Sequence, residues 1–251
     1  MSAAGRPTAY LSKAQQVAQE LLKRIIDSSL VPGQTFATEA DLLRSLDVSR
    51  PTLREGIRIL EAQGVLSQRP GPGGGLVIQR PSLDMLALSL SIYLRFNDVP
   101  FLPVLQAREV IEPALAAEAA QSGTEEDWRE MAESIERMLT QDQDQAAFIA
   151  ENRIFHNIVA RASGNKVLET FWGTISLLAH GELHGMKYTQ GNRKHVAAAH
   201  QQILDACRKR NPKAAAKAMA SHVGELEHLM RDRYKDVLLQ PMSVRDHRGV
   251  R

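Results

Sequence analysis

Histidine and asparagine side chains in the second half of the chain have the types and spacing of a metal site. Asn152 and His156 are four residues apart in a segment with helical periodicity, so they project from the same helix face. His200 and His222 lie in two later segments of the same kind. Three imidazoles and an amide oxygen could bind a borderline divalent ion and leave coordination positions open for a ligand. The spacing alone supports this site weakly, because a helical chain with eight histidines contains other such pairs, such as His180 with His184.

Arginines form a second group of side chains that could do chemistry. Arg50, Arg54 and Arg58 recur at i, i+4 and i+8, so they share one face of a helix. Ser49 is a typical N-cap residue, and Pro51 is tolerated because first-turn N–H groups have no helical partner. Guanidinium groups at the start of a helix suit a recognition helix in the major groove of DNA, where they reach guanine edges and phosphates. The alternative is a solvated charged face, which any helix can carry.

The segments around these arginines are typical of a winged helix-turn-helix. Leu42, Leu43 and Leu46 give a short helix one apolar face, and a polar turn separates it from the arginine helix. A hairpin with a Gly- and Pro-rich turn follows. These glycines do not form a nucleotide phosphate loop, since no Gly-Lys-Ser/Thr follows them and no helix starts there. The expected elements are helices at 12–29, 39–46 and from about Arg50 to Gly64, and strands at 65–69 and 76–78 around the turn 70–75.

After residue 81 the sequence shows helical patterns and no strand pattern. Short polar breaks separate the patterns, and several breaks carry helix start signals, as at Thr124 and Asn211. Seven helices in about 160 residues predict an antiparallel bundle. The expected helices span 82–96, 102–121, 124–141, 144–163, 166–188, 193–210 and 212–237.

The predicted fold class is therefore mainly α, with an N-terminal winged helix-turn-helix and a C-terminal all-helical bundle. We expect a flexible lead at 1–9, a DNA-binding domain at 10–79, a helical effector-binding and dimerisation domain at 80–238, and a flexible tail at 239–251. Residues 1–81 contain ten Lys/Arg against seven Asp/Glu, whereas residues 82–251 contain twenty-one against twenty-two. The basic excess thus lies on the expected DNA reader, and it is small enough that tight binding would need a dimer.

Composition excludes several other classes of protein. One cysteine, Cys207, rules out an intrachain disulfide and a cysteine-rich zinc module, and it suits a reducing compartment. The low aromatic content of 5% lacks the stacking platforms of a single-strand binder. Apolar runs long enough to span a bilayer are absent, as is a signal-peptide core, so we expect a cytoplasmic protein that does not engage a membrane.

The first half of the sequence resembles the DNA-binding domain of GntR-type bacterial transcription regulators. The resemblance covers about residues 11–80 and rests on VSRPTLREGIRILEAQGVL at 48–66 and GPGGGLVI at 71–78. Ala40 departs from it, because family members carry an arginine contact there. Carried over by position, the resemblance implies operator contacts by Ser49, Arg50, Thr52 and Arg54, with Gly73 and Gly74 at the wing tip.

Residues 100–230 are similar to the helical effector domain of the FadR subfamily, of the FCD type. The matching segments are LQAREVIEP at 105–113, FH at 155–156, SGNKVL at 163–168, HQQI at 200–203 and SHV at 221–223. Many members with this pattern bind zinc or a related metal through one Asp and three His, and use it with an Arg to hold a small organic acid. The resemblance thus implies the ligands His156, His200 and His222 for zinc, or for nickel or manganese, with Asn152 at the aspartate position and Arg108 at the arginine.

Two features of this effector site leave alternatives open. Asn152 keeps an oxygen ligand and removes its charge, so metal affinity should drop or the preferred metal should change; the alternative is a polar pocket without metal. Arg108 could equally be a helix cation paired with Glu112 at i+4, and the two roles can coexist because that carboxylate could orient the guanidinium for a ligand.

We therefore expect a homodimeric, ligand-responsive regulator, more often a repressor in this family, that binds a palindromic double-stranded operator and a small carboxylate. A regulator of a larger acyl-CoA or other lipid-like effector is the close alternative. A metal-dependent hydrolase is an alternative from another class, because His₃ with an open position can activate water. A constitutive DNA binder with a purely structural metal is a third.

Overall fold

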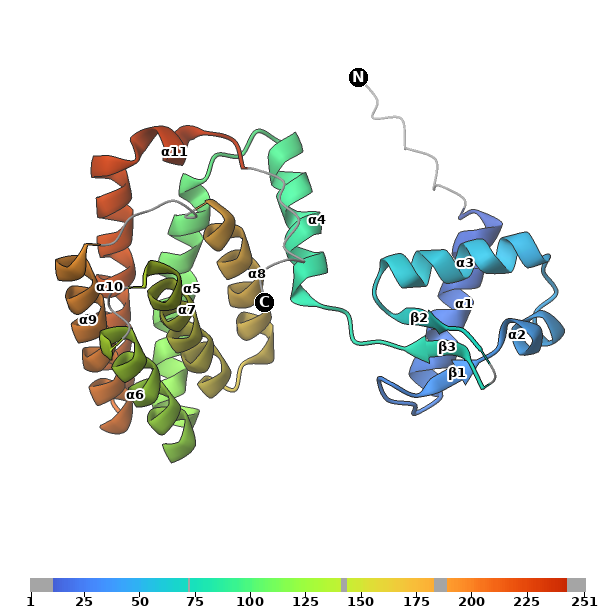
Figure 1. Cartoon of the computed structure of the whole chain (residues 1–251), viewed down its shortest axis with the longest axis horizontal. Helices are drawn as coiled ribbons and strands as arrows, with labels where there is room; N and C mark the ends of the chain where they lie inside the picture. The colour runs from blue at the N-terminus through green and yellow to red at the C-terminus, as the bar shows by residue number, and fades with distance from the viewer. Residues whose placement is uncertain (1–10, 72, 141–143, 183–188, 243–251) are drawn as a thin grey trace, which may run out of the picture. The chain divides into compact units, whose positions relative to one another are not determined.

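The computed structural model describes residues 11–71, 73–140, 144–182 and 189–242. The chain forms two compact units, Met1–Met85 and Leu86–Arg251, and each is described by itself (Figure 1). The expected flexible lead, and the expected tail from residue 243 onward, lie outside the described residues. Among the described helices, none combines the length and the apolar character that a bilayer span requires.

Capping residues set the helix starts of the first unit. Ser12 and Thr38 each form a reciprocal capping box with the residue three positions later, and Ser49 caps the helix that follows it. The expected helices are confirmed to within two residues at each end. In chain order the elements are α1 (Lys13–Asp27), β1 (Thr35–Ala37), α2 (Glu39–Ser45), α3 (Arg50–Ala62), β2 (Leu66–Arg69) and β3 (Gly75–Ile78).

The sheet of this unit has the order β1-β3-β2 and is antiparallel. The hairpin β2–β3 is in the expected place, with Leu66 opposite Ile78 and Arg69 opposite Gly75. Strand β1 was not expected, because three residues are too few to show an alternating pattern. It pairs with β3 close to Gly75, where a Cβ would lie 2.9 Å from the carbonyl oxygen of Ala37. Gly75 therefore permits the third strand.

Helices α1 and α3 pack closely over the sheet. Leu21, Leu53 and Ile57 are fully buried in one apolar cluster. Gly56 lies where α3 faces α1, and a Cβ added there would be 2.7 Å from Cγ1 of Val17 and 3.1 Å from a backbone oxygen of α1. Helix α3 can therefore pack this closely against α1 because residue 56 has no side chain.

The second unit is all helical in the described residues. Most expected ranges match within three residues, but the expected helix at 212–237 is wrong: the chain breaks at Tyr234, with φ −133° and ψ 34°. Because of this break, Val237 and Leu238 pack in an apolar cluster with Met242. Periodicity alone does not predict this packing. The helices are α4 (Leu83–Phe96), α5 (Leu102–Ser122), α6 (Glu125–Thr140), α7 (Gln145–Ala162), α8 (Lys166–Glu182), α9 (Gln190–Arg208), α10 (Pro212–Arg233) and α11 (Lys235–Leu239).

Helix α5 is the central helix of this unit, in contact with α7, α8, α9 and α10 (Figure 1). Its buried alanines, such as Ala116, Ala119 and Ala120, let the neighbouring helices approach closely. The chain also returns to the start of α5, where Pro241 pairs with Pro100 and the N–H of Phe101 donates to the carbonyl of Gln240. Residues 239–242, expected to be tail, are therefore part of the fold.

Candidate functional site

The start of α3 is fixed by Ser49 and Thr52. The Ser49 hydroxyl oxygen accepts a hydrogen bond from the backbone N–H of Thr52 at 3.4 Å and lies 2.8 Å from the Thr52 hydroxyl. These contacts hold the first turn of the helix in one arrangement, as an N-cap should. The N-terminus of α3 thus presents a fixed helix dipole and two hydroxyl groups at the solvent-exposed end.

Three arginines follow on one exposed face of α3. The Nε of Arg54 donates to both carboxylate oxygens of Glu39 at 3.1 and 3.2 Å, and Arg58 lies 3.4 Å from Glu55. Arg50 is exposed and has no partner among the described residues. Exposed ion pairs contribute at most about 1 kcal/mol, so a phosphate or a guanine edge can replace the carboxylates.

The wing requires glycine for reasons of backbone geometry. Gly73 has φ +75° and open space around the position of a Cβ, whereas a Cβ on Gly74 would lie 2.2 Å from the carbonyl oxygen of Arg69. Pro72, between them and Gly71, lies outside the described residues. The turn presents backbone with little side-chain bulk, which suits close approach to a nucleic-acid backbone.

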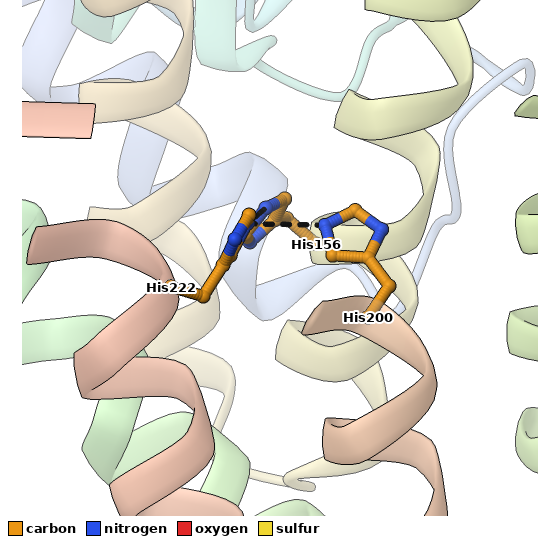
Figure 2. A group of neighbouring side chains, drawn as sticks. All are labelled: His156, His200 and His222. Atoms are coloured by element: carbon orange, nitrogen blue, oxygen red, sulfur yellow. Dashed lines mark hydrogen bonds between the residues drawn. The ribbon is translucent and has the colours of Figure 1, made fainter. Parts of the chain in front are cut away.

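In the helical unit, the three histidines expected as metal ligands meet at one point (Figure 2). They come from α7, α9 and α10, and their Nε2 atoms face one another. The Nε2 of His222 lies 3.2 Å from that of His156 and 3.1 Å from that of His200. All three ligand atoms lie within 4.8 Å of one another. Segments up to 66 residues apart in the chain therefore bring three nitrogen donors together.

Burial keeps two of these histidines neutral. His200 is fully buried and stacks on Phe155, with ring centroids 3.8 Å apart. Burial, and then the neighbouring His222 and His156, lowers the pKa of His200 well below its usual value. Burial, with a further contribution from His156, lowers the pKa of His222 to about 3. Neutral imidazole is the form that binds a metal ion.

A carboxylate and a guanidinium lie behind the triad, on α5. Nδ1 of His156 is 2.5 Å from Oε2 of Glu112, and Nε of Arg108 donates to Oε1 of the same carboxylate at 2.7 Å. Burial alone would raise the pKa of Glu112, but Arg108 and His156 outweigh it and lower that pKa to about 2. A carboxylate at the far nitrogen of a histidine orients the ring and directs Nε2 toward a metal.

Arg108 is itself held in place by two contacts, with Glu112 and with Trp172. Its side chain is 8% exposed, and its guanidinium carbon lies 5.3 Å from the ring centroid of Trp172. Only its Nε is used by Glu112, and among the described residues no group accepts a hydrogen bond from its two Nη groups. The outer edge of the guanidinium fork is therefore available to a ligand.

A cavity of about 200 Å³ opens beside these groups. Arg108, Asn152, His156 and His222 line it, whereas His200 lies deeper and is fully buried. Asn152 is partly buried there, one turn before His156 on α7. The remaining wall comes from α9 and α10 and consists of Asn192, His195, Val196, Val223, Glu225, Leu226 and Leu229.

The donor set fits a divalent metal ion. Two nitrogens bound to zinc at about 2.0–2.1 Å in a tetrahedral arrangement lie about 3.3 Å apart, close to the two shorter Nε2 separations in this site. If Glu112 holds the proton of His156 on Nδ1, the Nε2 of that ring presents a lone pair to its neighbours. A bound cation would accept a lone pair from each Nε2 that carries no proton. His156, His200 and His222 could hold it, with Asn152 lining the same cavity.

Sequence reasoning missed three contacts of this site. Glu112 was expected to pair with Arg108 alone, yet it also contacts His156. The contacts of the aromatic residues Phe155 and Trp172 were not predicted, because they cross between helices. The pair His180 and His184 cannot be compared, since the side chain of the first and the whole of the second lie outside the described residues.

Comparison with known proteins matches both units. A family model described as bacterial regulatory proteins of the gntR family matches residues 13–75, and one described as FCD domain matches residues 103–225. The chain is 26% identical to the galactonate operon transcriptional repressor of Escherichia coli, over 83% of this chain and 92% of the relative. It is 27% identical to the transcriptional repressor NanR of Citrobacter rodentium, over 88% and 86%. The solved structure of Streptococcus agalactiae GntR superposes with a TM-score of 0.68 at 26% identity, over 86% of this chain and 99% of that structure.

Proposed function

We propose that this protein, a ligand-responsive DNA-binding transcription regulator that joins a GntR-type winged helix-turn-helix to an FCD domain, receives its signal through a divalent metal site. The observation that carries the proposal is the convergence of three buried Nε2 atoms. His156, His200 and His222 would hold the ion, and Asn152 would add an amide oxygen. The ion, zinc by the donor set or else nickel or manganese, would supply open coordination positions for an oxygen of the effector.

The effector is a small carboxylate. The free edge of the Arg108 guanidinium lines the cavity, and this fork matches a planar carboxylate in two parallel hydrogen bonds. Glu112 fixes the orientation of that fork. A cavity of about 200 Å³ suits a ligand of a few carbon atoms. The relative from Escherichia coli is named for the operon of galactonate, itself a small carboxylate.

The DNA contacts lie at the start of α3 and in the wing. Ser49, Arg50, Thr52, Arg54 and Arg58 would face the major groove and its phosphates, and Gly73 and Gly74 would approach the backbone. Two copies related by a two-fold axis would place two such readers on a palindromic operator. Effector binding would then change operator affinity by the difference in its affinity for the two arrangements, typically about 1–3 kcal/mol.

Elemental analysis of the protein tests the metal site. The protein is purified without chelator and without a metal-affinity resin, together with His200→Ala and the control His195→Ala. About one metal ion per chain should be found in the wild type and in the control, because His195 lies at the wall of the cavity and outside the triad. The ion should be lost from His200→Ala. Equal metal content in all three proteins would exclude the triad as the site.

The effector contact is tested by Arg108→Lys beside Arg108→Ala. Lysine keeps the charge beside Glu112 but cannot form the bidentate fork. Both variants should bind operator DNA and lose the response to the effector, and the lysine variant should keep the stability of the fold. Normal effector response in Arg108→Lys would remove the carboxylate clamp from the mechanism.

A further inference from the structure

The donor set around the histidine triad carries no negative charge. Two of its imidazoles are kept neutral by burial, and the Asn152 amide is neutral by nature. Within the described residues, neither a carboxylate oxygen nor a thiol joins the three Nε2 atoms. The carboxylate that touches the triad is Glu112, which binds the Nδ1 side of His156 and thus lies behind the ring.

The negative charge of Glu112 is already paired with the positive charge of Arg108. Arg108 donates to it at 2.7 Å, and both side chains are buried. The second acidic residue at the cavity, Glu225, is half exposed, lies three residues after His222 on α10, and is 2.7 Å from Nε2 of His195. A divalent cation at the triad would therefore have no carboxylate among its protein ligands, beside a guanidinium whose charge Glu112 balances.

An uncompensated divalent charge in a buried site is unfavourable. Moving an ion out of water is costly unless opposite charge and hydrogen bonds replace the water. In this cavity an anion from outside the protein can supply opposite charge directly to the ion, because Glu112 pairs with Arg108 and Glu225 is half exposed beside His195. The anion that enters the cavity would meet the ion on one side and the free Nη groups of Arg108 on the other.

We propose that the metal ion and the anionic effector bind cooperatively, because the effector supplies the negative charge that this donor set lacks. This inference rests on the metal site proposed above. A carboxylate suits both the Arg108 fork and the ion, and a second oxygen donor, as in a 2-hydroxy acid or a 1,3-dicarboxylate, would let one ligand reach both. By thermodynamic linkage each ligand raises the affinity for the other by the same factor, about 5- to 150-fold for typical coupling.

Cooperative binding gives the regulator two requirements for one response. At metal concentrations below the dissociation constant of the effector-free site, the metal site stays empty until the anion is present. The anion alone meets Arg108 without the second positive partner and binds weakly. Operator binding would therefore respond to the two ligands only when both are present.

Zinc titrations of the full-length protein test this inference. Zinc affinity is measured by competition with a chromophoric chelator, alone and with millimolar lactate, malonate or propionate, and each anion is corrected for its own zinc binding. Lactate or malonate should raise the affinity about 5- to 150-fold. Propionate has one carboxylate and no second oxygen donor, so it should raise the affinity less.

Two variants separate the charge effect from other changes. Asn152→Asp places a carboxylate one turn from His156, so it should bind zinc more tightly without any anion and gain less from lactate. Gln121→Glu is the control: it adds the same charge to an exposed position of α5 outside the cavity lining. It should behave like the wild type.

The outcomes distinguish this inference from the metal site itself. If zinc affinity is the same with and without lactate and malonate, cooperativity is overturned while the metal site stands. If Gln121→Glu gains as much affinity as Asn152→Asp, the missing charge is not local to the triad, and the inference fails in that form. If no zinc binds under any condition, the proposed metal site fails.

Discussion

The protein contains two Arg–Glu pairs of similar geometry in opposite surroundings. In the first unit, Arg54 binds Glu39 at 3.1 Å, with the two side chains 58% and 27% exposed. In the second unit, Arg108 binds Glu112 at 2.7 Å, with 8% and 2% exposed. Water competes with the first pair and not with the second. The first arginine can therefore release its carboxylate to another partner, which we propose to be DNA, whereas the second pair is a fixed part of the cavity wall.

Replacing each glutamate by glutamine should separate the two pairs most strongly. Glu112→Gln leaves a buried guanidinium without its counter-charge, which typically destabilises a protein by about 3–5 kcal/mol. Glu39→Gln removes an exposed pair and should change stability by at most about 1 kcal/mol. The free energy of unfolding from urea titrations checks both values. A loss of similar size in both variants would mean that burial does not distinguish the pairs.

In the first unit, the packing of α3 against α1 should depend on the absence of a side chain at Gly56. Gly56→Ala puts a methyl group 2.7 Å from Cγ1 of Val17, and such overpacking costs about 1–3 kcal/mol. Hydrogen exchange of α1 and α3 peptides measures the loss. Exchange in α7 and α10 peptides serves as the internal control, and unchanged protection of α3 would show that the two helices separate easily.

DNA binding should depend on Arg54, the arginine of the exposed pair. Arg54→Ala should weaken operator binding by about 1–3 kcal/mol if the guanidinium contacts a base edge, and the loss should depend on the sequence of the operator. A gel-shift midpoint equal to that of the wild type would reject α3 as the recognition helix. Arg44→Ala is the control variant. Arg44 is also exposed and has its own ion pair, with Asp41, but it lies on α2.

Acid should destabilise one unit and spare the other. The pKa of His222 is lowered to about 3 and that of His200 is also lowered, so the unfolded chain takes up protons below pH 6.5 while the folded, metal-free unit does not. Their contribution to stability is therefore present above pH 6.5 and is lost as the pH falls, by about 1 kcal/mol for each histidine between pH 7.5 and 5.5.

The first unit supplies the control for this pH effect, because residues 1–85 contain no histidine. With chelator present, hydrogen exchange in α9 and α10 should accelerate over this pH range while exchange in α3 stays constant after correction for intrinsic rates. Equal acceleration in both units would assign the effect to groups other than the buried imidazoles.

Local signals in the sequence were sufficient for much of the fold. The N-cap Ser49, the glycines of the wing and the apolar spacing of most helices each depend on neighbours within a few residues, and those elements are where they were expected. Strand β1 and the break at Tyr234 depend on partners elsewhere in the chain, β3 and the apolar cluster around Met242. Periodicity contains no information about such partners.

In the candidate site, too, contacts within one helix were predictable from the sequence and contacts between helices were not. The i, i+4 spacing of Arg108 and Glu112 was enough to predict their pairing, and the family pattern singled out the three histidines that the structure brings together. The contact between Glu112 and His156 joins α5 to α7, and its formation depends on how each helix is rotated in the bundle. That rotation is set by packing of the whole unit, so no local pattern could give it.

The position of Trp172 provides an optical reporter of the cavity. Its ring lies against the Arg108 guanidinium and 5.6 Å from the ring of His156, and its indole N–H donates to Asn157. The other tryptophan, Trp128, lies in a different apolar cluster beside Arg210. A paramagnetic ion such as Cu²⁺ at the triad would quench the Trp172 emission, and Trp128 would supply a reference signal. The regulator can thus be followed by its own fluorescence, without an attached dye.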